Sequence, residues 1–590
     1  VYGGTYQGNI STWSRTSREQ KSIKEYPELG LSIAPKDSKY RYNWNAPIIT
    51  SPHNRATVYH AGNVVFKTID QGINWSVISP DLTKNEITKH GPGGGPYTNE
   101  AAGGENYNTL TALVESQHEQ GVLYAGSDDG LLHITKNGGE SWENITPDGI
   151  KDGIINSIDV SQHDPAIAYV VIMRYKSMDL NSHIFKTNNY GQTWTRIVTG
   201  LNDPNGFARV VRADKKQPGL LYAGTETGLY VSNDDGIFWQ RLKLNLPVVA
   251  INDLIIQDND LVAATSGRGF WILDDLGALQ NKGLQNKAIE LVKPKATYRI
   301  FGGTSKAVGQ GQNPKSGVTF DYYLEKNIDS LPLKLEVLQN SQVIRTYTNK
   351  KVANFKSWPG GPSKPQILPS KKGYNRFTWD FRREPLPSIH KVFIFGGLSG
   401  SNVAPGNYTL RMTLGDVVSE TEAIILSNPK VVSSPEDFIE QQKMLVSIEN
   451  TVKEMHESVN QMRSAKTQLT NYAKLLKDKK NADSLIEKGE ALTKRINSWE
   501  ENLIQAKQKT FQDVINFNNK LNAQLIQLKS YLDQANPKVT SGAKERFRDL
   551  MEDWQVYKTE QDAIITTEMS AYNMLYKSLD IPALIIKDKE

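Results

Sequence analysis

Four carboxylates lie at predicted strand ends or in loops, where enzymes often present catalytic acids. They are Glu105, Asp128, Asp129 and Glu226. A glycosidase needs two carboxyl groups facing each other across a cleft, and their separation decides between inversion and retention. The segments 128–130 and 226–228 also fit ordinary turns, in which a carboxylate accepts backbone hydrogen bonds. The pattern therefore leaves open a paired-acid site and a purely structural role.

Arginines on strand-like segments suggest a second chemistry. A sialidase binds the carboxylate of its substrate with three converging arginines, and the candidates here are Arg174, Arg209, Arg212 and Arg268. Arginines on inner strands of a repeat protein also pair with carboxylates of neighbouring repeats, so their spacing alone does not make them converge. We take Arg268, with Glu105, Asp128 and Glu226, as a candidate catalytic residue, and Arg174 and Arg212 as candidate ligand contacts.

A long glycine-rich segment covers residues 91–105. It lacks the Lys-Ser/Thr ending and the following helix of a phosphate-binding loop, which argues against a nucleotide site. A lid or contact surface and a connection without function remain the two interpretations. Tyr97, Tyr107 and Tyr175 would add stacking surfaces for a sugar or a peptide.

Metal and cofactor chemistry finds little support. The chain has no cysteine and 9 histidines, which are scattered without an H-E-x-x-H motif. We therefore predict no metal site and no cofactor, with a structural calcium among the acidic turns as the alternative.

Four copies of the pattern T/S-x-D/N-x-G-x-x-W position these candidates. They begin at Thr68, Thr135, Thr187 and Ser232. The Asp or Asn can bond the backbone of its own turn, the Gly supplies a positive φ, and the Trp opens the next strand with a large apolar face. We call each copy a box and predict structural roles for Asp70 and Trp75, Asn137 and Trp142, Asn189 and Trp194, and Asp234 and Trp239.

Residues 1–280 are predicted to form β-propeller blades. The tryptophans of successive boxes are 67, 52 and 45 residues apart, and a four-stranded blade takes about 40–50 residues. Degenerate copies at 2–13 and 261–275 bring the visible blades to about six. The chain opens inside an expected strand without an initiator Met. We expect it to be the C-terminal part of a longer precursor whose missing part supplies further blades and an export signal.

Two further domains are predicted. Residues 281–432 contain a linker and alternating strands of an immunoglobulin-like β-sandwich, ending near the segment 404–411. Residues 433–590 read as an antiparallel helical bundle or coiled coil, with Ser434 as the N-cap and helices at about 482–507, 513–534 and 540–578. The bundle is interpreted as self-contained or as docking a partner or the propeller rim.

Composition excludes two classes of function. The net charge is +5 with acids and bases interspersed, which argues against a nucleic-acid groove. No apolar run reaches the roughly 18 residues of a membrane span.

The boxes resemble Asp boxes, the hairpin signature of sialidases, two-propeller endoglucanases and sortilin-type receptor domains. The segments 207–213, 224–232, 244–247 and 266–275, with 509–521 in the helical part, resemble exported bacterial proteins labelled sortilin-type or BNR-repeat glycosyl hydrolases. Members often carry His where Ser266 stands here. The resemblance implies a secreted, periplasmic or cell-surface protein of the bacterial envelope. Activity does not follow from the fold and depends on a site.

We therefore predict an exported binding or assembly module. Its propeller face and channel would hold a peptide, protein or glycan, and its helices would brace the propeller or dock a neighbouring envelope or outer-membrane protein. The missing N-terminal part is a further expected partner. The alternative is a glycoside hydrolase, sialidase-like or endoglucanase-like, with carboxylates in the propeller channel.

Overall fold

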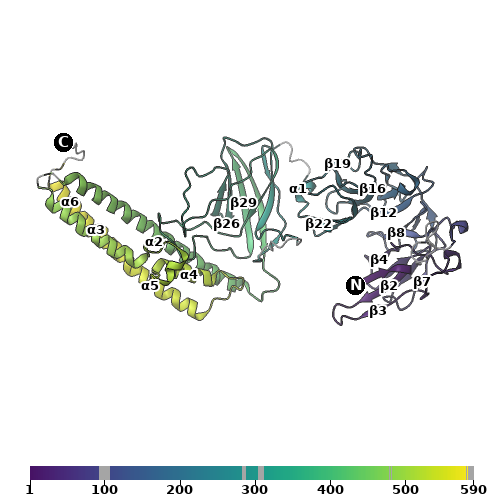
Figure 1. Ribbon diagram of the computed structural model, residues 1–590, viewed down its shortest axis with the longest axis horizontal. Helices are drawn as coiled ribbons and strands as arrows, with labels where there is room; N and C mark the ends of the chain where they lie inside the picture. Colours follow the sequence, from purple (N-terminus) through teal and green to yellow (C-terminus); the bar gives the residue numbers. More distant parts are fainter. Residues whose placement is uncertain are drawn as a thin grey trace. The chain divides into compact units, whose positions relative to one another are not determined.

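The computed structural model describes residues 1–91, 106–281, 287–302, 311–477, 479, 481–579 and 581 (Figure 1). The chain forms two compact units, Val1–Gln280 and Asn281–Glu590. Unit 1 consists mainly of small antiparallel sheets. Unit 2 contains two further sheets and the long helices.

The described residues of unit 1 form a series of six small sheets, each made of strands that are consecutive in sequence. The first two contain β1 (Tyr2–Thr5), β2 (Asn9–Trp13) and β3 (Gln20–Ser22), and then β4 (Ile48–Thr50), β5 (Val58–Ala61), β6 (Val65–Thr68) and β7 (Ser76–Val77). The next two contain β8 (Leu110–Glu115), β9 (Leu123–Ser127), β10 (Leu132–Thr135) and β11 (Glu143–Asn144), and then β12 (Ile154–Val160), β13 (Ala168–Met173), β14 (Ile184–Thr187) and β15 (Thr195–Arg196). The last two contain β16 (Ala208–Ala213), β17 (Leu221–Thr225), β18 (Leu229–Ser232) and β19 (Gln240–Arg241), and then β20 (Ile251–Gln257), β21 (Asp260–Thr265) and β22 (Phe270–Leu273).

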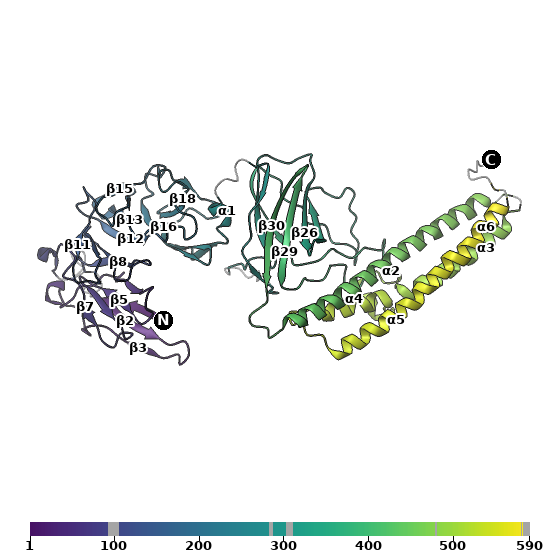
Figure 2. The same cartoon turned by 180° about the vertical axis from the view of Figure 1, so that it is seen from behind.

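Neighbouring sheets pack through their innermost strands. Strand β4 lies against β8, β8 against β12, β12 against β16, and β16 against β20. Figures 1 and 2 show the sheets of unit 1 following one another along a curve. Meandering sheets that pack in this order are the blades of a β-propeller, which the repeat spacing predicts.

Each four-stranded sheet has turns at both ends of its strands, and we call these two ends its edges. In an antiparallel meander, the turns between the first and second strands and between the third and fourth strands share one edge. The four boxes join third to fourth strands, so we call this edge the box edge. The turns between second and third strands and the connections between sheets lie at the opposite edge, which we call the loop edge.

Each box closes its turn with side-chain hydrogen bonds to the backbone. In the first, the hydroxyl of Thr68 donates to Asp70 at 2.8 Å and accepts from the N–H of Gly72 at 2.9 Å. Hydrogen bonds from Asn74 hold the pKa of Asp70 down at about 2. Gly72 has φ +94°, which a side chain would resist. The box residues thus satisfy their own turn.

Each box also fastens its sheet to the preceding one. The indole N–H of each box tryptophan donates to the carbonyl of an isoleucine at the end of the previous sheet, and we call this contact the latch. The latches are Trp75 to Ile23 at 2.8 Å, Trp142 to Ile78 at 2.8 Å, Trp194 to Ile145 at 2.7 Å and Trp239 to Ile197 at 2.9 Å.

Unit 2 begins with two sheets that share one hydrophobic core. The smaller sheet contains β23 (Ile289–Leu291), β25 (Val318–Leu324) and β28 (Gly373–Trp379). The larger contains β24 (Thr297–Tyr298), β30 (Val417–Leu426), β29 (Gly406–Leu414), β26 (Leu333–Gln339) and β27 (Gln342–Thr348). Phe320 and Trp379 of the smaller sheet are buried with Leu335 and Leu410 of the larger.

The helices are α2 (Pro435–Leu476), α3 (Asp483–Leu503), α4 (Leu521–Leu532), α5 (Ser541–Ala563) and α6 (Ser570–Ser578), with a π-helical turn at Ile564–Met569. Ser434 is the N-cap of α2, as predicted, and forms a capping box with Asp437. The predicted helix at 513–534 is wrong in its first part, because Asp513 instead caps a short 3₁₀ turn and α4 starts at Leu521. Within the described ranges, no helix combines the length and the apolar character needed to cross a membrane.

The helices do not form a self-contained bundle. The segment between β28 and β29 leaves the sheets, and its Leu386, Ile389 and Val392 are buried in the same cluster as Leu445 and Ile448 of α2. Polar contacts continue this interface. They include Asn402 with Asp533 at 3.0 Å, Arg383 with Glu449 at 3.3 Å, and His456 with the carbonyl of Pro387 at 2.7 Å. Helices and sheets of unit 2 therefore depend on one another.

Candidate functional site

The strand order gathers most of the sequence candidates at the loop edge of unit 1. Asp128 follows β9, Arg174 and Tyr175 follow β13, Glu226 follows β17, and Arg268 follows β21. Tyr107 lies shortly before β8, also at this edge. Glu105 and Tyr97 lie outside the described residues. Arg212 is the penultimate residue of β16 and therefore lies toward the box edge.

Asp128 is a buried carboxyl group. Its side chain accepts hydrogen bonds from the backbone N–H of Thr109 at 2.9 Å and from the Thr109 hydroxyl at 3.0 Å. Asn43 adds a longer contact at 3.3 Å. Burial outweighs these hydrogen bonds and raises the pKa of Asp128 to about 6. Among the described acidic candidates, this carboxyl group has a pKa suited to donating a proton near neutral pH.

Asp129 has a structural role. It is fully buried and accepts hydrogen bonds from the backbone N–H of Lys84 at 2.9 Å and from the side chain of Asn108. The side-chain oxygen of Asn108 in turn contacts His90 at 2.8 Å. This network joins Asn108 to His90, and these two residues flank the 91–105 segment in the sequence. The pKa of Tyr107 is raised, first by burial and then by the negative charges of Asp129 and Asp128.

Arg174 is held by two carboxylates. Its Nε lies 2.8 Å from Asp152 and its Nη1 lies 2.9 Å from Asp179. The hydrogen bond from Arg174 is the largest cause that lowers the pKa of Asp152. His183 lies 2.9 Å from Asp179 on the same side. The guanidinium group of Arg174 therefore stabilises the conformation of this loop.

Tyr175 and Phe207 form an aromatic surface. Their rings are stacked with centroids 5.5 Å apart and an interplanar angle of 14°. The guanidinium of Arg209 lies 5.5 Å from the centre of the Phe207 ring and is paired with Glu226. Tyr175 remains 37% exposed. Phe207, Arg209 and Glu226 are thus in contact with one another, and Tyr175 faces solvent.

Three of the four candidate arginines, Arg174, Arg209 and Arg212, are bonded to different partners. Arg212 bonds Asp253 and the hydroxyl of Ser157, at 2.8 and 2.7 Å, and so joins the inner strands of three neighbouring sheets. Arg268 is exposed in the turn between β21 and β22, and its carbonyl accepts the indole N–H of Trp271 at 3.2 Å. These contacts indicate that Arg174, Arg209 and Arg212 stabilise the fold.

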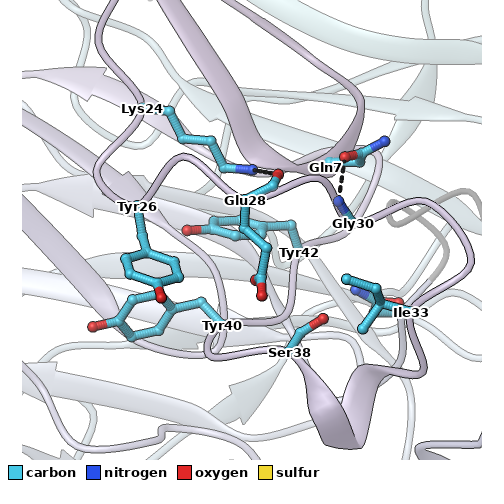
Figure 3. A pocket seen from close by; sticks show the side chains of 10 residues that line it. Gln7, Lys24, Tyr26, Glu28, Gly30, Ile33, Ser38, Tyr40 and Tyr42 are labelled. Atoms are coloured by element: carbon cyan, nitrogen blue, oxygen red, sulfur yellow. Dashed lines mark hydrogen bonds between the residues drawn. The ribbon is translucent and has the colours of Figure 1, made fainter.

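A tyrosine-lined crevice at the loop edge of the first two sheets is absent from the sequence candidates. A small cavity of about 20 Å³ lies among Tyr26, Tyr40, Tyr42, Lys24, Glu28 and Asn106 (Figure 3). Tyr26 and Tyr40 meet edge to face at 6.1 Å, and Lys39 lies 4.5 Å from the Tyr26 ring centre. The tyrosine-rich run at 40–42 was the signal that could have indicated it. Asn106 directly follows the glycine-rich segment in the sequence.

Metal ligation has no evident centre in the part of the chain that the structure describes. No group of three His, Asp or Glu side chains there has an arrangement that could hold an ion. The predicted absence of a cofactor and the alternative of a structural calcium both stay predictions.

Comparisons with known proteins give weak likenesses. No protein-family model matches the chain, and no curated protein matches its sequence. Among solved structures, "YCF48 bound to D1 peptide" is 15% identical with a TM-score of 0.30, covering 47% of this chain and 74% of YCF48. A GH74 xyloglucanase from Xanthomonas campestris is 15% identical with a TM-score of 0.33, covering 71% of this chain. PorZ, a surface component of the type-IX secretion system of Porphyromonas gingivalis, is 13% identical with a TM-score of 0.34, covering 72% of this chain. The chain spans 64% of the xyloglucanase and 56% of PorZ. At these TM-scores the matches do not assign a function.

Proposed function

We propose that this chain is an exported or cell-surface binding and assembly module whose loop edge contacts a protein partner. The observation that carries the proposal is the pairing of charges at this edge. Arg174 is bonded to Asp152 and Asp179, and Arg209 to Glu226. Arginines and carboxylates that form ion pairs with each other stabilise the conformation of the surface. They are poorly placed to act on a substrate.

The exposed aromatic surfaces at the same edge favour recognition. Tyr175 is stacked on Phe207, and Tyr26 is 42% exposed beside the crevice of Figure 3. Tyrosine gives a large contact area with little loss of conformational freedom, and its hydroxyl can bond a partner's backbone. An extended peptide or a flat protein surface has the chemistry that such a surface recognises. A glycan stacked on the same rings is the related ligand class.

Unit 2 would hold the module in an assembly. We assign its two sheets to an immunoglobulin-like sandwich and its helices to a brace, in line with the resemblance to exported sortilin-type proteins. The exposed faces of α2 and α5 carry many charged residues, which suit contacts with a neighbouring envelope protein.

The test is binding of the purified chain to arrays of peptides and glycans. Tyr175→Ala should weaken binding of selected ligands by roughly tenfold, because an aromatic anchor is removed. Phe238→Ala is the matched control, since Phe238 is 46% exposed at the box edge. Equal loss in both variants, or ligands that bind Tyr175→Ala as well as the native chain, would refute the loop edge as the contact surface.

One observation favours a second function. Asp128 is a buried carboxyl group whose pKa burial raises to about 6, and the general acid of a glycoside hydrolase needs a pKa raised in this way. Turnover of a glycan panel by the native chain that disappears in Asp128→Asn would establish this alternative. Absence of turnover across the panel would leave the binding module.

A further inference from the structure

The sixth sheet ends differently from the sheets before it. In four sheets the box turn donates a backbone hydrogen bond to the turn between the first and second strands, for example Asp235 N to the Gly219 carbonyl at 2.8 Å. In the sixth sheet the same bond runs from Leu276 N to the Asn259 carbonyl at 2.9 Å. Leu276 therefore stands where Asp235 stands in the fifth sheet. Four residues further on, Gln280 takes the position of Trp239.

Gln280 does not form a latch. It ends the short helix α1 (Gly277–Gln280), and its amide bonds Asp214 at 3.0 Å and Asn259 at 2.7 Å. Within the described residues, no fourth strand follows to pair with β22, and this sheet has three strands. The fifth sheet has β19 in that place. In the part of the chain that the structure describes, the sixth sheet thus has neither the box tryptophan nor an outer strand.

The place that this tryptophan would occupy is a cavity. Trp239 is buried among side chains that include Ile184, Ile197, Leu221, Ala223 and Tyr230. The strand registers put five residues of the fifth and sixth sheets at the corresponding positions. They are Leu229, Leu242, Leu261, Ala263 and Trp271, and all five line one cavity of about 50 Å³.

The backbone confirms this correspondence. Ile197 N donates to the Ile184 carbonyl at 2.9 Å, and Leu242 N donates to the Leu229 carbonyl at 2.8 Å. Leu242 therefore occupies the isoleucine position of the latch. The cavity beside it is the fifth member of a series whose other four members each hold an indole.

The side of β22 that faces away from β21 is suited to pairing with another strand. The turn before it is closed by a bond from Thr265 N to the Gly269 carbonyl at 3.1 Å. In an antiparallel ladder the next residue, Phe270, and then Ile272 direct their N–H and C=O groups away from β21. The side chains of Phe270 and Ile272 are 79% and 59% exposed. An apolar strand with one open edge is a template for strand addition.

The chain itself does not offer the missing tryptophan. All 11 of its tryptophans lie within the described residues. Trp13 is on β2, the central strand of the first sheet, and Trp44 packs on Tyr6 at 4.2 Å. The indoles outside the boxes at Trp358, Trp379 and Trp499 each donate to a carbonyl, and Trp554 donates to Glu454. Trp271 lines the cavity.

We propose that an extended segment of a partner protein adds to β22 as the fourth strand of the sixth sheet and inserts a tryptophan into this cavity. The indole N–H would donate to the Leu242 carbonyl, as Trp239 donates to Ile197. The chemistry of the occupant is set by the four latches of the same chain. The inference deepens the proposed function by giving the partner a sequence character, and the cavity shares no lining residue with the aromatic surface of Tyr175 and Phe207.

The experiment uses the purified chain and a labelled synthetic peptide with the sequence of residues 232–243, which carries a box and a fourth strand. Fluorescence polarisation should show saturable binding. Replacing the tryptophan by alanine in the peptide should weaken binding by roughly tenfold or more, because a buried aromatic anchor is lost. Hydrogen exchange should slow at the amides of Phe270 and Ile272.

Two variants of the chain locate the site. Ala263→Phe fills the cavity and should reduce peptide affinity to the level of the alanine peptide, with an unchanged thermal unfolding midpoint as evidence of folding. Ile255→Ser is the control, because Ile255 is 54% exposed on the other side of the same sheet. If Ala263→Phe does not fold, the alanine peptide and hydrogen exchange still decide.

Other outcomes would overturn the inference. Binding that ignores both the peptide tryptophan and Ala263→Phe, or no saturable binding, refutes the site. Self-association in ultracentrifugation that Ala263→Phe abolishes would assign the site to a second copy of this chain. Tyr175→Ala should leave peptide binding unchanged. If the Tyr175→Ala experiment refutes the loop edge as a contact surface, the peptide experiment still tests the tryptophan site independently.

Discussion

The box edge and the loop edge are built from the same strands and are stabilised in opposite ways. The box edge repeats one latch four times, always an indole N–H on an isoleucine carbonyl. At the loop edge every turn is different. Asp129 bonds Asn108, Arg174 bonds Asp152, and Arg209 bonds Glu226. The repeated contact fastens successive sheets to one another, and the varied turns form the surface that is free to acquire a specific contact.

Removal of a latch should have the largest effect. Trp239 is 1% exposed, so Trp239→Ala leaves a cavity between the fourth and fifth sheets and orphans the Ile197 carbonyl. We expect a loss of about 3–5 kcal/mol in the free energy of unfolding of unit 1. Urea denaturation followed by circular dichroism measures it.

The matched change at the loop edge is Trp44→Ala. Trp44 is 50% exposed and packs on Tyr6 alone among aromatic rings of the described chain. Its loss should cost less than about 1 kcal/mol, because little buried area is removed. Equal costs for the two tryptophans would contradict the distinction between the edges.

Glycines give the next largest contrast. Gly236 has φ +87°, and a Cβ placed on it would lie 2.5 Å from Ile197. Gly236→Ala should cost about 2–5 kcal/mol, the sum of left-handed strain and overpacking. Gly267 at the loop edge has φ +81° with open space around it, so Gly267→Ala should cost only about 1–2 kcal/mol. A thermal shift assay on both variants compares them.

The buried acid of the loop edge should show its cost through pH. The folded pKa of Asp128 is about 6, above the ordinary value of 3.8 for an aspartate, so the folded state holds this proton more tightly than the unfolded state. Stability should therefore decrease as pH rises from about 4 to about 6, and the full cost should be present above pH 6. Asp128→Asn should stabilise unit 1 by up to about 3 kcal/mol at pH 7 and by nothing below pH 4.

Denaturation of the native chain and Asp128→Asn over this pH range tests the sign. Asp234→Asn serves as the box-edge control, because the pKa of Asp234 is lowered by its hydrogen bonds. Its variant should lose stability at neutral pH relative to the native chain. A pH profile of Asp128→Asn parallel to the native profile would contradict the buried-acid assignment.

The architecture of unit 1 is predictable because its signals are local. Thr68, Asp70, Gly72 and Trp75 fall within eight residues, and their turn bonds are made among themselves. The carbonyl that receives Trp75 belongs to Ile23, 52 residues away, yet its place follows from the repeat. The degenerate copy at 261–275 predicts a blade, but the helical turn of α1 in place of a fourth strand depends on bonds from Gln280 to Asp214, which the sequence does not indicate.

The candidate site is less predictable because its partners are distant and never repeated. Asp129 and Asn108 are 21 residues apart, and nothing in either segment indicates the pairing. The same limit applies in unit 2, where the segment around Ile389 lies between two strands but is buried with the helices. Loop residues could be placed at the correct edge from strand order. Their hydrogen bonds could not be read from composition or spacing.

The smallest effect is expected at an exposed ion pair and tests whether the loop edge is held by its charges. Arg174→Met removes the largest cause of the lowered pKa of Asp152, so the pKa of that carboxyl group should rise toward its ordinary value. NMR titration of Asp152 measures this rise, and Arg212→Met, whose partners are Asp253 and Ser157, should leave it unchanged. The side chain of Asp152 is 43% exposed, so solvent screens the pair and the free energy of unfolding should change by less than about 1 kcal/mol. A large loss of stability would mean that Arg174 fastens the sheets as the latches do, and the contrast between the two edges would fail at that point.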